Sequence, residues 1–221
     1  MRAPFTLKQI RTGLEKGLQD WGFLKPTLTL ATLGATKQAV DKLTVEMVAA
    51  PTDAPVFQVR DRVELFDADG VRCFVGWARI TRPKLSATAK RHRITFEGPA
   101  RFLRSDFLSA ARYRRTDETF EELQVASLVL NAVSSFIDVP ETHPLELREQ
   151  LSVIYDFAIG RAGVASPFTY ELTGIPADLV LPEIPALANT CAACAETVLS
   201  FTPSINQRFD YTGSGAPVLR A

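Results

Sequence analysis

The chain has 221 residues, of which 46% are hydrophobic and 23% are charged, a composition typical of a folded globular protein and not of a disordered one. Its formal net charge is zero, so the totals favour neither a nucleic-acid binder nor a membrane-surface binder. There is no apolar run near the roughly 20 residues that span a bilayer, no apolar leader at the start, and only three cysteines. We therefore expect synthesis in a reducing cytoplasm, without secretion or membrane contact.

The first expected element is a helix at the N-terminus. Apolar residues recur there at spacings of three and four, which places them on one face of a helix: Leu7, Ile10, Leu14 and Leu18. Two glycines within the segment lower its helical propensity. The sequence predicts that this helix ends near Trp21.

From residue 27 to residue 98 the apolar residues recur with a period of two, which is typical of half-buried strands. The expected strands include residues 28–30, 43–47, 63–65, 71–81 and 91–98. The segment 71–81 is apolar on both faces, which predicts a central strand or one that meets another subunit. The preceding residues read DADG and predict a tight turn, because Gly70 tolerates a positive φ. Short strands at this spacing indicate a small antiparallel barrel or sandwich.

Helical periodicity returns after residue 116. Residues 119–122 read TFEE, which is the pattern of a capping box at the start of a helix. Apolar residues follow at helical spacing as far as Phe136, so the sequence predicts a helix here. The stretch 140–186 holds six prolines, and we expect it to be irregular apart from a short strand at 168–172.

The C-terminal segment predicts one more helix and two short strands. Pro185 suits the first turn of a helix, and an apolar stripe follows that includes Cys191 and Cys194. The two strands are expected at residues 207–211 and 217–220.

Together these elements predict an α+β fold. It consists of an antiparallel β-barrel or sandwich with an N-terminal helix, followed by a helix-containing second section. We expect residues 1–115 and residues 116–221 to form separate domains, because the strand pattern dominates the first part and the helical pattern returns in the second.

Charge is distributed unevenly along the chain. Residues 79–115 contain eleven Lys or Arg and two Asp or Glu, which gives a net charge of +9. Residues 117–150 contain one Arg and eight Asp or Glu, which gives −7. Blocks of opposite charge can pair within the fold or across a subunit interface, and the sequence leaves both possibilities open.

Cys191 and Cys194 form a CxxC pair, a spacing that can bind zinc or carry out redox chemistry. A structural zinc site needs about four ligands, and the sequence has no second pair. Because both cysteines fall on the apolar stripe of the expected helix, we interpret them as small core residues.

Neither histidine has a catalytic setting. His92 lies between two arginines in an expected strand and His143 lies near prolines in an expected loop, so we interpret both as surface residues. Asp67, Asp69 and Gly70 match only part of a calcium loop, and a β-turn explains them. The sequence has no nucleophile elbow, phosphate-binding loop or dinucleotide-binding motif. We therefore expect no enzyme activity, no cofactor and no metal.

Two stretches of the chain resemble the hub proteins of bacteriophage tails, the baseplate-hub or tail-tip group. In the first, a strand with an acidic turn precedes a strand of pattern FxGxI, a further strand and a short apolar turn. The matching residues are Val63–Phe66, Asp69-Gly70, Phe74-Val75-Gly76-Trp77, Ile94–Glu97 and Phe102-Leu103, with Ala78 in place of the isoleucine. The second stretch is similar to the closing strands of such hubs and includes Phe209-Asp210-Tyr211-Thr212, Pro217 and Leu219.

The resemblance implies a structural protein of the virion tail tip, made in the cytoplasm of the host bacterium. Its implied partners are copies of itself in a trimeric ring, together with tail tube, distal tail, and spike or fibre proteins. A ring needs one face of a subunit to meet a different face of the next. The charge blocks and the strand 71–81 supply the candidate interface: Trp77, Arg79, Arg91, Arg93, Arg112, Arg114, Arg115, Glu118, Glu121 and Glu122.

A second function stays open. The basic segment 79–115 contains interleaved aromatic residues, a pattern found in modules that bind nucleic acid. Phe96 reads as inward-facing and Phe102 as part of a packed helical turn, so nucleic acid is not the expected partner. The alternative is a β-barrel module that binds nucleic acid or polysaccharide through this segment. A cell-wall hydrolase would need paired carboxylates or a metal centre, and the sequence offers neither convincingly.

Overall fold

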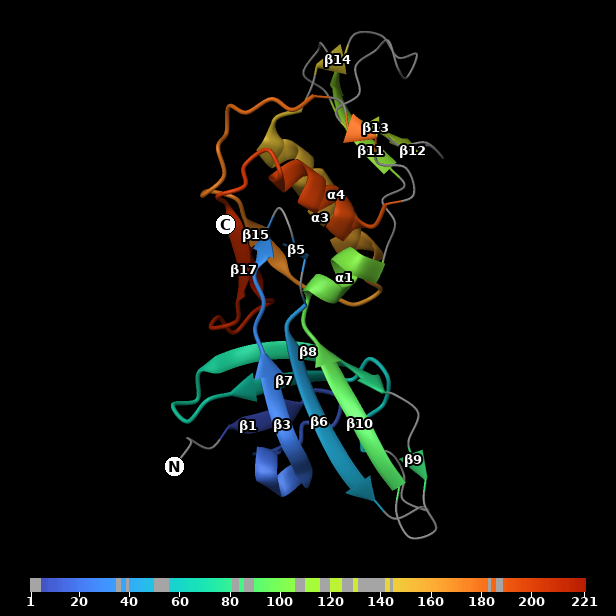
Figure 1. Ribbon diagram of the computed structural model, residues 1–221, viewed down its shortest axis with the longest axis vertical. Helices are drawn as coiled ribbons and strands as arrows, with labels where there is room; N and C mark the ends of the chain where they lie inside the picture. The colour runs from blue at the N-terminus through green and yellow to red at the C-terminus, as the bar shows by residue number, and fades with distance from the viewer. Residues whose placement is uncertain are drawn as a thin grey trace. The chain divides into compact units, whose positions relative to one another are not determined.

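A computed structural model describes residues 5–34, 37–38, 40–49, 56–80, 84–85, 90–105, 110–115, 120–124, 129–130, 142–143, 145–182, 184–185 and 189–221 (Figure 1). Within these residues the fold is α+β, with mainly antiparallel sheet and three α-helices. The expected fold class is therefore confirmed. None of the helices in the described ranges is long and apolar enough to cross a membrane.

The chain forms two compact units, each assembled from stretches that are separate in sequence. Unit 1 comprises Met1–Ala31, Val40–Pro99 and Asp210–Pro217, and unit 2 comprises Thr32–Ala39, Ala100–Phe209 and Val218–Ala221. The chain therefore passes between the units five times. Contacts alone do not test whether a part cut at residue 115 folds by itself, so the division into domains 1–115 and 116–221 stays a prediction.

Unit 1 contains a curled, antiparallel sheet of eight strands (Figure 1). The strand order is β2–β1–β7–β8–β10–β6–β3, with the short β9 beside β10. The strands are β1 (Thr6–Gln9), β2 (Glu15–Gly17), β3 (Phe23–Thr29), β6 (Lys42–Ala49), β7 (Arg62–Phe66), β8 (Arg72–Ile80), β9 (Lys84–Leu85) and β10 (Lys90–Glu97). The antiparallel barrel or sandwich predicted from the sequence corresponds to this curled sheet.

The strands of unit 1 form where the apolar residues alternate. Leu43 and Val45 of β6 and Ile94 and Phe96 of β10 are buried, as the period of two predicts. Successive residues of a strand point to opposite faces, and residues 74–78 of β8 are all buried. The prediction that β8 is a central strand is thus confirmed.

The turn between β7 and β8 is the one that the DADG sequence predicts. The Asp67 N–H donates to the Val71 carbonyl at 2.9 Å, and the Gly70 N–H donates to the Asp67 carbonyl at 3.1 Å. Gly70 has φ +75°, in the left-handed region. The Asp67 carboxylate caps the turn, because its Oδ1 accepts hydrogen bonds from the N–H groups of Asp69 (3.0 Å) and Val71 (2.9 Å).

The expected N-terminal helix is wrong. The segment forms the β1–β2 hairpin, followed by the short 3₁₀ helix η1 (Leu18–Trp21). Gly13 has φ +71° and its N–H donates to the Gln9 carbonyl, so the chain reverses where a helix would continue. Leu7 is buried and lies opposite Leu65 of β7. Pairing with a distant strand therefore outweighs the local helical spacing.

Residues 210–217 belong to unit 1 although most of the C-terminal part belongs to unit 2, and polar groups hold them there. The buried guanidinium of Arg72 donates to the carbonyls of Tyr211 (2.7 Å), Gly215 (2.7 Å) and Gly213. A guanidinium presents five N–H donors in a fixed plane, so one side chain can satisfy several carbonyls of a returning segment.

Asp41 is a second residue that holds distant segments of unit 1 together. It bonds to residues near the positions where the chain enters and leaves that unit. Its carboxylate accepts hydrogen bonds from the Tyr211 hydroxyl and the Ala31 N–H, and its carbonyl accepts from the Gly98 N–H at 2.7 Å. Residue 98 must be glycine here, because a Cβ would lie 2.9 Å from the Asp41 Cβ. Burial raises the pKa of Asp41, and the hydrogen bonds from Tyr211 and Ala31 offset this only in part.

Unit 2 contains the three α-helices: α1 (Ala100–Ser105), α3 (Leu147–Arg161) and α4 (Cys191–Leu199). Its sheets have the orders β12–β11–β14, β13–β16 and β15–β18–β17–β4–β5. The strands are β4 (Leu33–Gly34), β5 (Lys37–Gln38), β11 (Ala110–Arg115), β12 (Phe120–Gln124), β13 (Val129–Leu130), β14 (Thr142–His143), β15 (Thr169–Glu171), β16 (Ile184–Pro185), β17 (Asn206–Asp210) and β18 (Val218–Arg220). The expected strands at 168–172, 207–211 and 217–220 are confirmed.

The helix expected after the TFEE sequence is wrong where the structure describes this segment. Residues 120–124 form β12, which pairs with β11, and residues 129–130 form β13, which pairs with β16. A capping box stabilises a helix start by about 1 kcal/mol, which is little against the pairing of a whole strand. The remainder of the expected helix, to Phe136, lies outside the described residues.

Two further corrections concern the helices of unit 2. The stretch 140–186 is not irregular throughout, because it contains the 15-residue helix α3. The last helix begins at Cys191 and not near Pro185, which belongs to β16. Thr190 is the N-cap, since its hydroxyl accepts a hydrogen bond from the Ala193 N–H at 3.2 Å.

Candidate interaction surfaces

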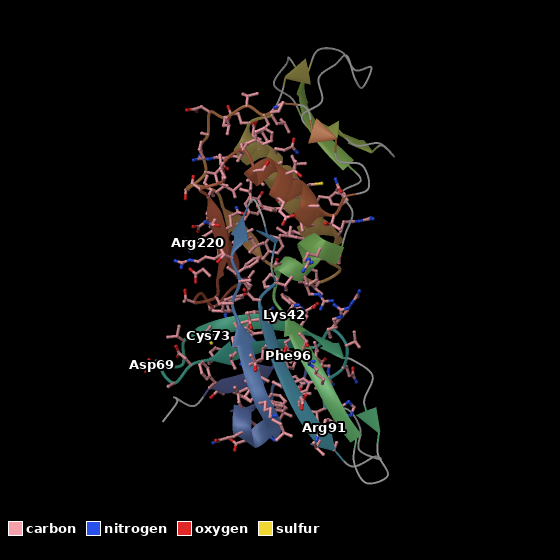
Figure 2. The ribbon with its side chains drawn as sticks, viewed as in Figure 1. Lys42, Asp69, Cys73, Arg91, Phe96 and Arg220 are labelled. Atoms are coloured by element: carbon pink, nitrogen blue, oxygen red, sulfur yellow. The ribbon has the colours of Figure 1, made fainter. Side chains whose placement is uncertain are left out.

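Part of the expected interface lies on one face of unit 1, which we call the arginine face (Arg79, Arg91 and Arg93). All three side chains are exposed, and Arg79 lies opposite Thr95 of β10, so the three point to the same side of the sheet. Figure 2 shows Arg91 towards one end of β10. Trp77 belongs to the same strand as Arg79 but is only 3% exposed, so its side chain is buried within the chain.

The other expected interface residues lie in unit 2, where the two charge blocks meet in a single ladder. Arg112 of β11 lies opposite Glu122 of β12, and Tyr113 lies opposite Glu121. Arg114 and Arg115 of β11 lie opposite residues of β14, and Glu118 is outside the described residues. The backbone register thus places residues of the basic block opposite residues of the acidic block in one sheet, and a subunit contact through these blocks stays a prediction.

A hydrogen-bond network around the buried Asp61 fixes the loop of the β1–β2 hairpin. Arg11 donates to the carboxylate of Asp61 through Nε (2.7 Å) and a terminal nitrogen (3.0 Å). Gln9 Nε2 (2.7 Å) and the Gln58 N–H (2.9 Å) donate to the same carboxylate. Burial alone would raise the pKa of Asp61, but the bonds from Arg11, Gln58 and Gln9 outweigh it and hold the pKa below 3.8. No local sequence pattern indicates this network, because Arg11 and Gln9 are 50 and 52 residues away from Asp61.

Four exposed apolar side chains of unit 1 lie in the two segments that this network joins. Ile10 and Leu14 in the hairpin loop, and Val56 and Val59 in the segment before β7, are all exposed. The Ile10 N–H donates to the Arg62 carbonyl at 3.0 Å, which ties the loop to the start of β7. Large apolar side chains exposed on neighbouring segments are typical of interaction sites.

The cysteines and histidines do not assemble a reactive centre in the parts of the chain that the structure describes. Cys191 and Cys194 are buried cysteines of α4 that are not in a disulfide, and burial raises the pKa of Cys194 to about 11. His92 lies in β10 and His143 in β14, so the expected loop position of His143 is wrong. Among the described residues there is no group of three or more potential metal ligands of the types His, Cys, Asp and Glu.

A cavity of about 600 Å³ lies within unit 1, between η1 and β3. Its described lining is mainly apolar and includes Phe5, Phe23, Leu43 and Leu65, with no charged side chain among the described lining residues.

The fold of the chain occurs in phage tail proteins. No protein-family model and no curated protein sequence matches the chain significantly. The 43 kDa tail protein of prophage MuSo2 from Shewanella oneidensis matches 99% of this chain over 55% of its own, at 11% identity and a TM-score of 0.53. A tail protein from Neisseria meningitidis MC58 matches 99% of this chain over 50% of its own, at 10% identity and a TM-score of 0.50.

A third solved structure belongs to a component of the type VI secretion system of Escherichia coli, described as structurally similar to the bacteriophage T4 tail proteins gp27 and gp5. It matches 89% of this chain over 46% of its own, at 11% identity and a TM-score of 0.52. This chain thus spans about half the length of the three solved chains. The chain shares the fold of phage and prophage tail proteins, which confirms at the level of the fold the resemblance that the sequence predicts.

Proposed function

We propose that this chain is a structural component of a phage or prophage-derived tail tip. It assembles as a trimeric ring that joins the tail tube to the spike or fibre, and it acts by contact with other subunits, without catalysis. The observation that carries this proposal is the likeness in fold over 99% of the chain to two tail proteins. Because a fold can serve several functions, the proposal also needs surfaces suited to assembly.

Such surfaces are present on unit 1. The arginine face exposes three guanidinium groups on two neighbouring strands, and arginine is enriched at protein interfaces. The apolar side chains beside Asp61 supply a second exposed surface. We propose that the arginine face, with Arg112, Arg114, Arg115, Glu118, Glu121 and Glu122 of the charge blocks, contributes to contacts with neighbouring tail subunits.

The experiment that tests the proposal mixes the purified chain with the tube and spike proteins encoded beside it. Negative-stain microscopy is expected to show ring-shaped particles and, with tube protein present, density at one end of the tube. An unrelated protein of similar size is the control for adventitious attachment. A chain that neither forms rings nor attaches to tube or spike would contradict the proposed tail-tip role.

The rival function is binding of nucleic acid or polysaccharide through the segment 79–115. The arginine face is interleaved with carboxylates: Arg79 pairs with Glu97 at 3.2 Å, and Arg93 lies opposite Glu46 of β6. These acidic groups lower the positive potential that phosphate binding requires. A mobility shift of DNA that falls with salt and is lost in Arg91→Ala/Arg93→Ala would favour the rival function.

A further inference from the structure

We infer that unit 1 carries two complementary surfaces at opposite ends of strand β7, and that surface A of one copy binds surface B of the next. Surface A consists of residues 10–14 and 56–61, and surface B is the turn formed by residues 67–71. The inference rests on the proposed function, because it names the surfaces through which copies of the chain would meet in the proposed ring.

Surface A exposes both apolar and polar side chains. Its exposed apolar side chains are Ile10, Leu14, Val56 and Val59. Val59, at 66%, has the largest exposed fraction among the large apolar side chains of the described residues. Large apolar side chains exposed together on one surface lower the free energy of a complex that removes them from water.

The buried polar network holds surface A in one conformation. Asp61 binds Arg11 from the hairpin loop and the Gln58 N–H from the second segment, so one carboxylate fixes both halves of the surface. Gln9 adds a bond from its Nε2 to the Val56 carbonyl at 3.2 Å. A surface that is already ordered loses less conformational entropy on binding than a mobile loop does.

Surface B is acidic and is ordered by its own turn. Its side chains include Asp67, the exposed Asp69 and the exposed Val71. Figure 2 shows Asp69 at the tip of the β7–β8 turn. Because the Asp67 carboxylate binds two N–H groups of the turn, the position of Asp69 and Val71 is fixed. Surface B thus combines an apolar side chain with exposed negative charge.

The register of the sheet places the two surfaces at opposite ends of β7. Gln9 lies opposite Val63 near the start of β7, so the hairpin loop that follows Gln9 lies at that end. Thr6 lies opposite Phe66 at the other end, where the turn of surface B begins. Two different surfaces at opposite ends of one element give head-to-tail contacts, the kind that generates rings.

Charge supports the pairing of A with B. Surface A has the exposed Arg60 and the partly exposed Arg11, which is paired with the buried Asp61, whereas surface B has Asp67 and Asp69. An A–B contact therefore brings together apolar side chains and opposite charges, while A–A and B–B contacts bring like charges together. The charge pattern selects a second copy in head-to-tail orientation.

The test measures self-association of the full chain by sedimentation velocity over a range of concentrations. Val59→Glu places a carboxylate in surface A, and the fold tolerates it because the side chain is mostly exposed. We expect the dissociation constant to rise about tenfold or more. The matched comparison is Val48→Glu, at a 49% exposed valine opposite Arg91 of the arginine face, and because this valine lies outside surfaces A and B we expect a smaller change there.

Charge reversal gives a second, independent readout. Arg60→Glu and Asp69→Arg each place like charges across the proposed contact, so each is expected to weaken self-association. The double variant restores opposite charges at every contact, and we expect its dissociation constant to return towards the wild-type value. Thermal unfolding of each variant shows that the fold is retained, and rescue by the double variant would not follow from two independent folding defects.

The outcomes separate this inference from the proposed function. If the wild-type chain associates and Val48→Glu weakens association while Val59→Glu does not, the copies meet at the arginine face. In that case the proposed A–B contact is wrong, but the proposed assembly into a ring is not contradicted. A wild-type chain that remains monomeric at every concentration also overturns the A–B contact, and attachment to tube or spike then decides the tail role separately. Failure of the double variant to recover would exclude the pairing of Arg60 with Asp69.

Discussion

The two units bury polar side chains of different kinds. Among the described residues, unit 1 buries the charged side chains of Asp41, Asp61 and Arg72, whereas the buried polar side chains of unit 2 include Gln150 and Gln207 but none that is charged. In both units these groups tie together segments that are far apart in sequence. The free energy of unfolding of unit 1 should therefore depend on charge and pH, and that of unit 2 should depend mainly on neutral hydrogen bonds and packing.

The chain contains its own probes for this comparison. Both of its tryptophans, Trp21 and Trp77, belong to unit 1, so tryptophan fluorescence reports on that unit. The described α-helices belong to unit 2, so the helical circular dichroism signal reports mainly on it. If the two signals change together in urea, the units unfold as one cooperative body, and separate transitions would give each unit its own free energy of unfolding.

The largest decrease in the free energy of unfolding is expected from Arg72→Ala. The substitution leaves three carbonyls of the segment 210–217 without their donor at a mostly buried site, and it removes one of the two arginine partners of Glu64. Removing one partner of such a network typically lowers the free energy of unfolding by about 3–5 kcal/mol. Urea titration followed by tryptophan fluorescence measures this loss. A loss confined to the helical signal would contradict the assignment of the segment 210–217 to unit 1.

The next largest decrease in the free energy of unfolding is expected from a matched pair of substitutions, Tyr211→Phe in unit 1 and Tyr155→Phe in unit 2. Each removes one buried hydroxyl: Tyr211 donates to the carboxylate of Asp41 in unit 1, and Tyr155 donates to the amide oxygen of Gln207 at 2.5 Å in unit 2. Hydrogen bonds to charged groups contribute about 1.5–3 kcal/mol and neutral ones about 0.5–1.5 kcal/mol. We expect Tyr211→Phe to lower the free energy of unfolding more, as measured in urea. Equal losses would show that the charge of the acceptor is unimportant here.

Local patterns in the sequence were sufficient for the strands of unit 1 that follow residue 27, but not for β1 and β2. The alternation around Leu43 and Val45 and the DADG turn each depend on a few neighbouring residues, and both are confirmed. The expected N-terminal helix failed because the same leucine spacing fits a hairpin whose Leu7 pairs with Leu65, a contact that the local pattern does not contain. Helix α3 could have been found, since its buried residues recur at helical spacing: Leu147, Leu151, Ile154, Tyr155 and Ala158.

The hydrogen bonds of Asp41 and Arg72 in unit 1 could not be predicted from the sequence, because their partners are far away along the chain. Tyr211 and Asp41 are 170 positions apart, and nothing local to either residue indicates a partner. Likewise, Arg72 reads as one more polar residue at the edge of a strand until residues 210–217 are placed beside it. The exposure of Arg79, Arg91 and Arg93 does follow from the alternation along their strands, whereas their part in an interface stays a prediction.

A smaller effect is expected from pH, where the two buried carboxylates of unit 1 respond in opposite directions. The folded pKa of Asp61 lies below 3.8, so the stability that Asp61 contributes is complete above pH 3.8 and is lost as pH falls through the lowered value. The folded pKa of Asp41 lies above 3.8, so its contribution is complete below pH 3.8 and is lost as pH rises through the raised value.

The corresponding variants are Asp61→Asn and Asp41→Asn. The difference in free energy of unfolding between wild type and Asp61→Asn should shrink as the pH falls below 3.8. The stability of Asp41→Asn relative to wild type should improve as the pH rises above 3.8. Urea titrations by tryptophan fluorescence between about pH 3 and pH 8 measure both differences. Differences that do not change with pH would show that neither carboxyl has a shifted pKa.

The smallest decrease in the free energy of unfolding is expected from Arg79→Ala. Arg79 is exposed, whereas Arg72 in the same strand is buried, so the two substitutions compare an exposed with a buried arginine. The Arg79 side chain is 70% exposed, and it forms an ion pair with Glu97 at 3.2 Å. Exposed pairs of this kind contribute about 0–1 kcal/mol, and salt weakens them further. Urea titrations at low and high salt should therefore show a small loss that salt abolishes. A loss as large as that of Arg72→Ala would remove the contrast between buried and exposed charge. A small loss makes Arg79→Ala a folded variant with which to test the arginine face in assembly.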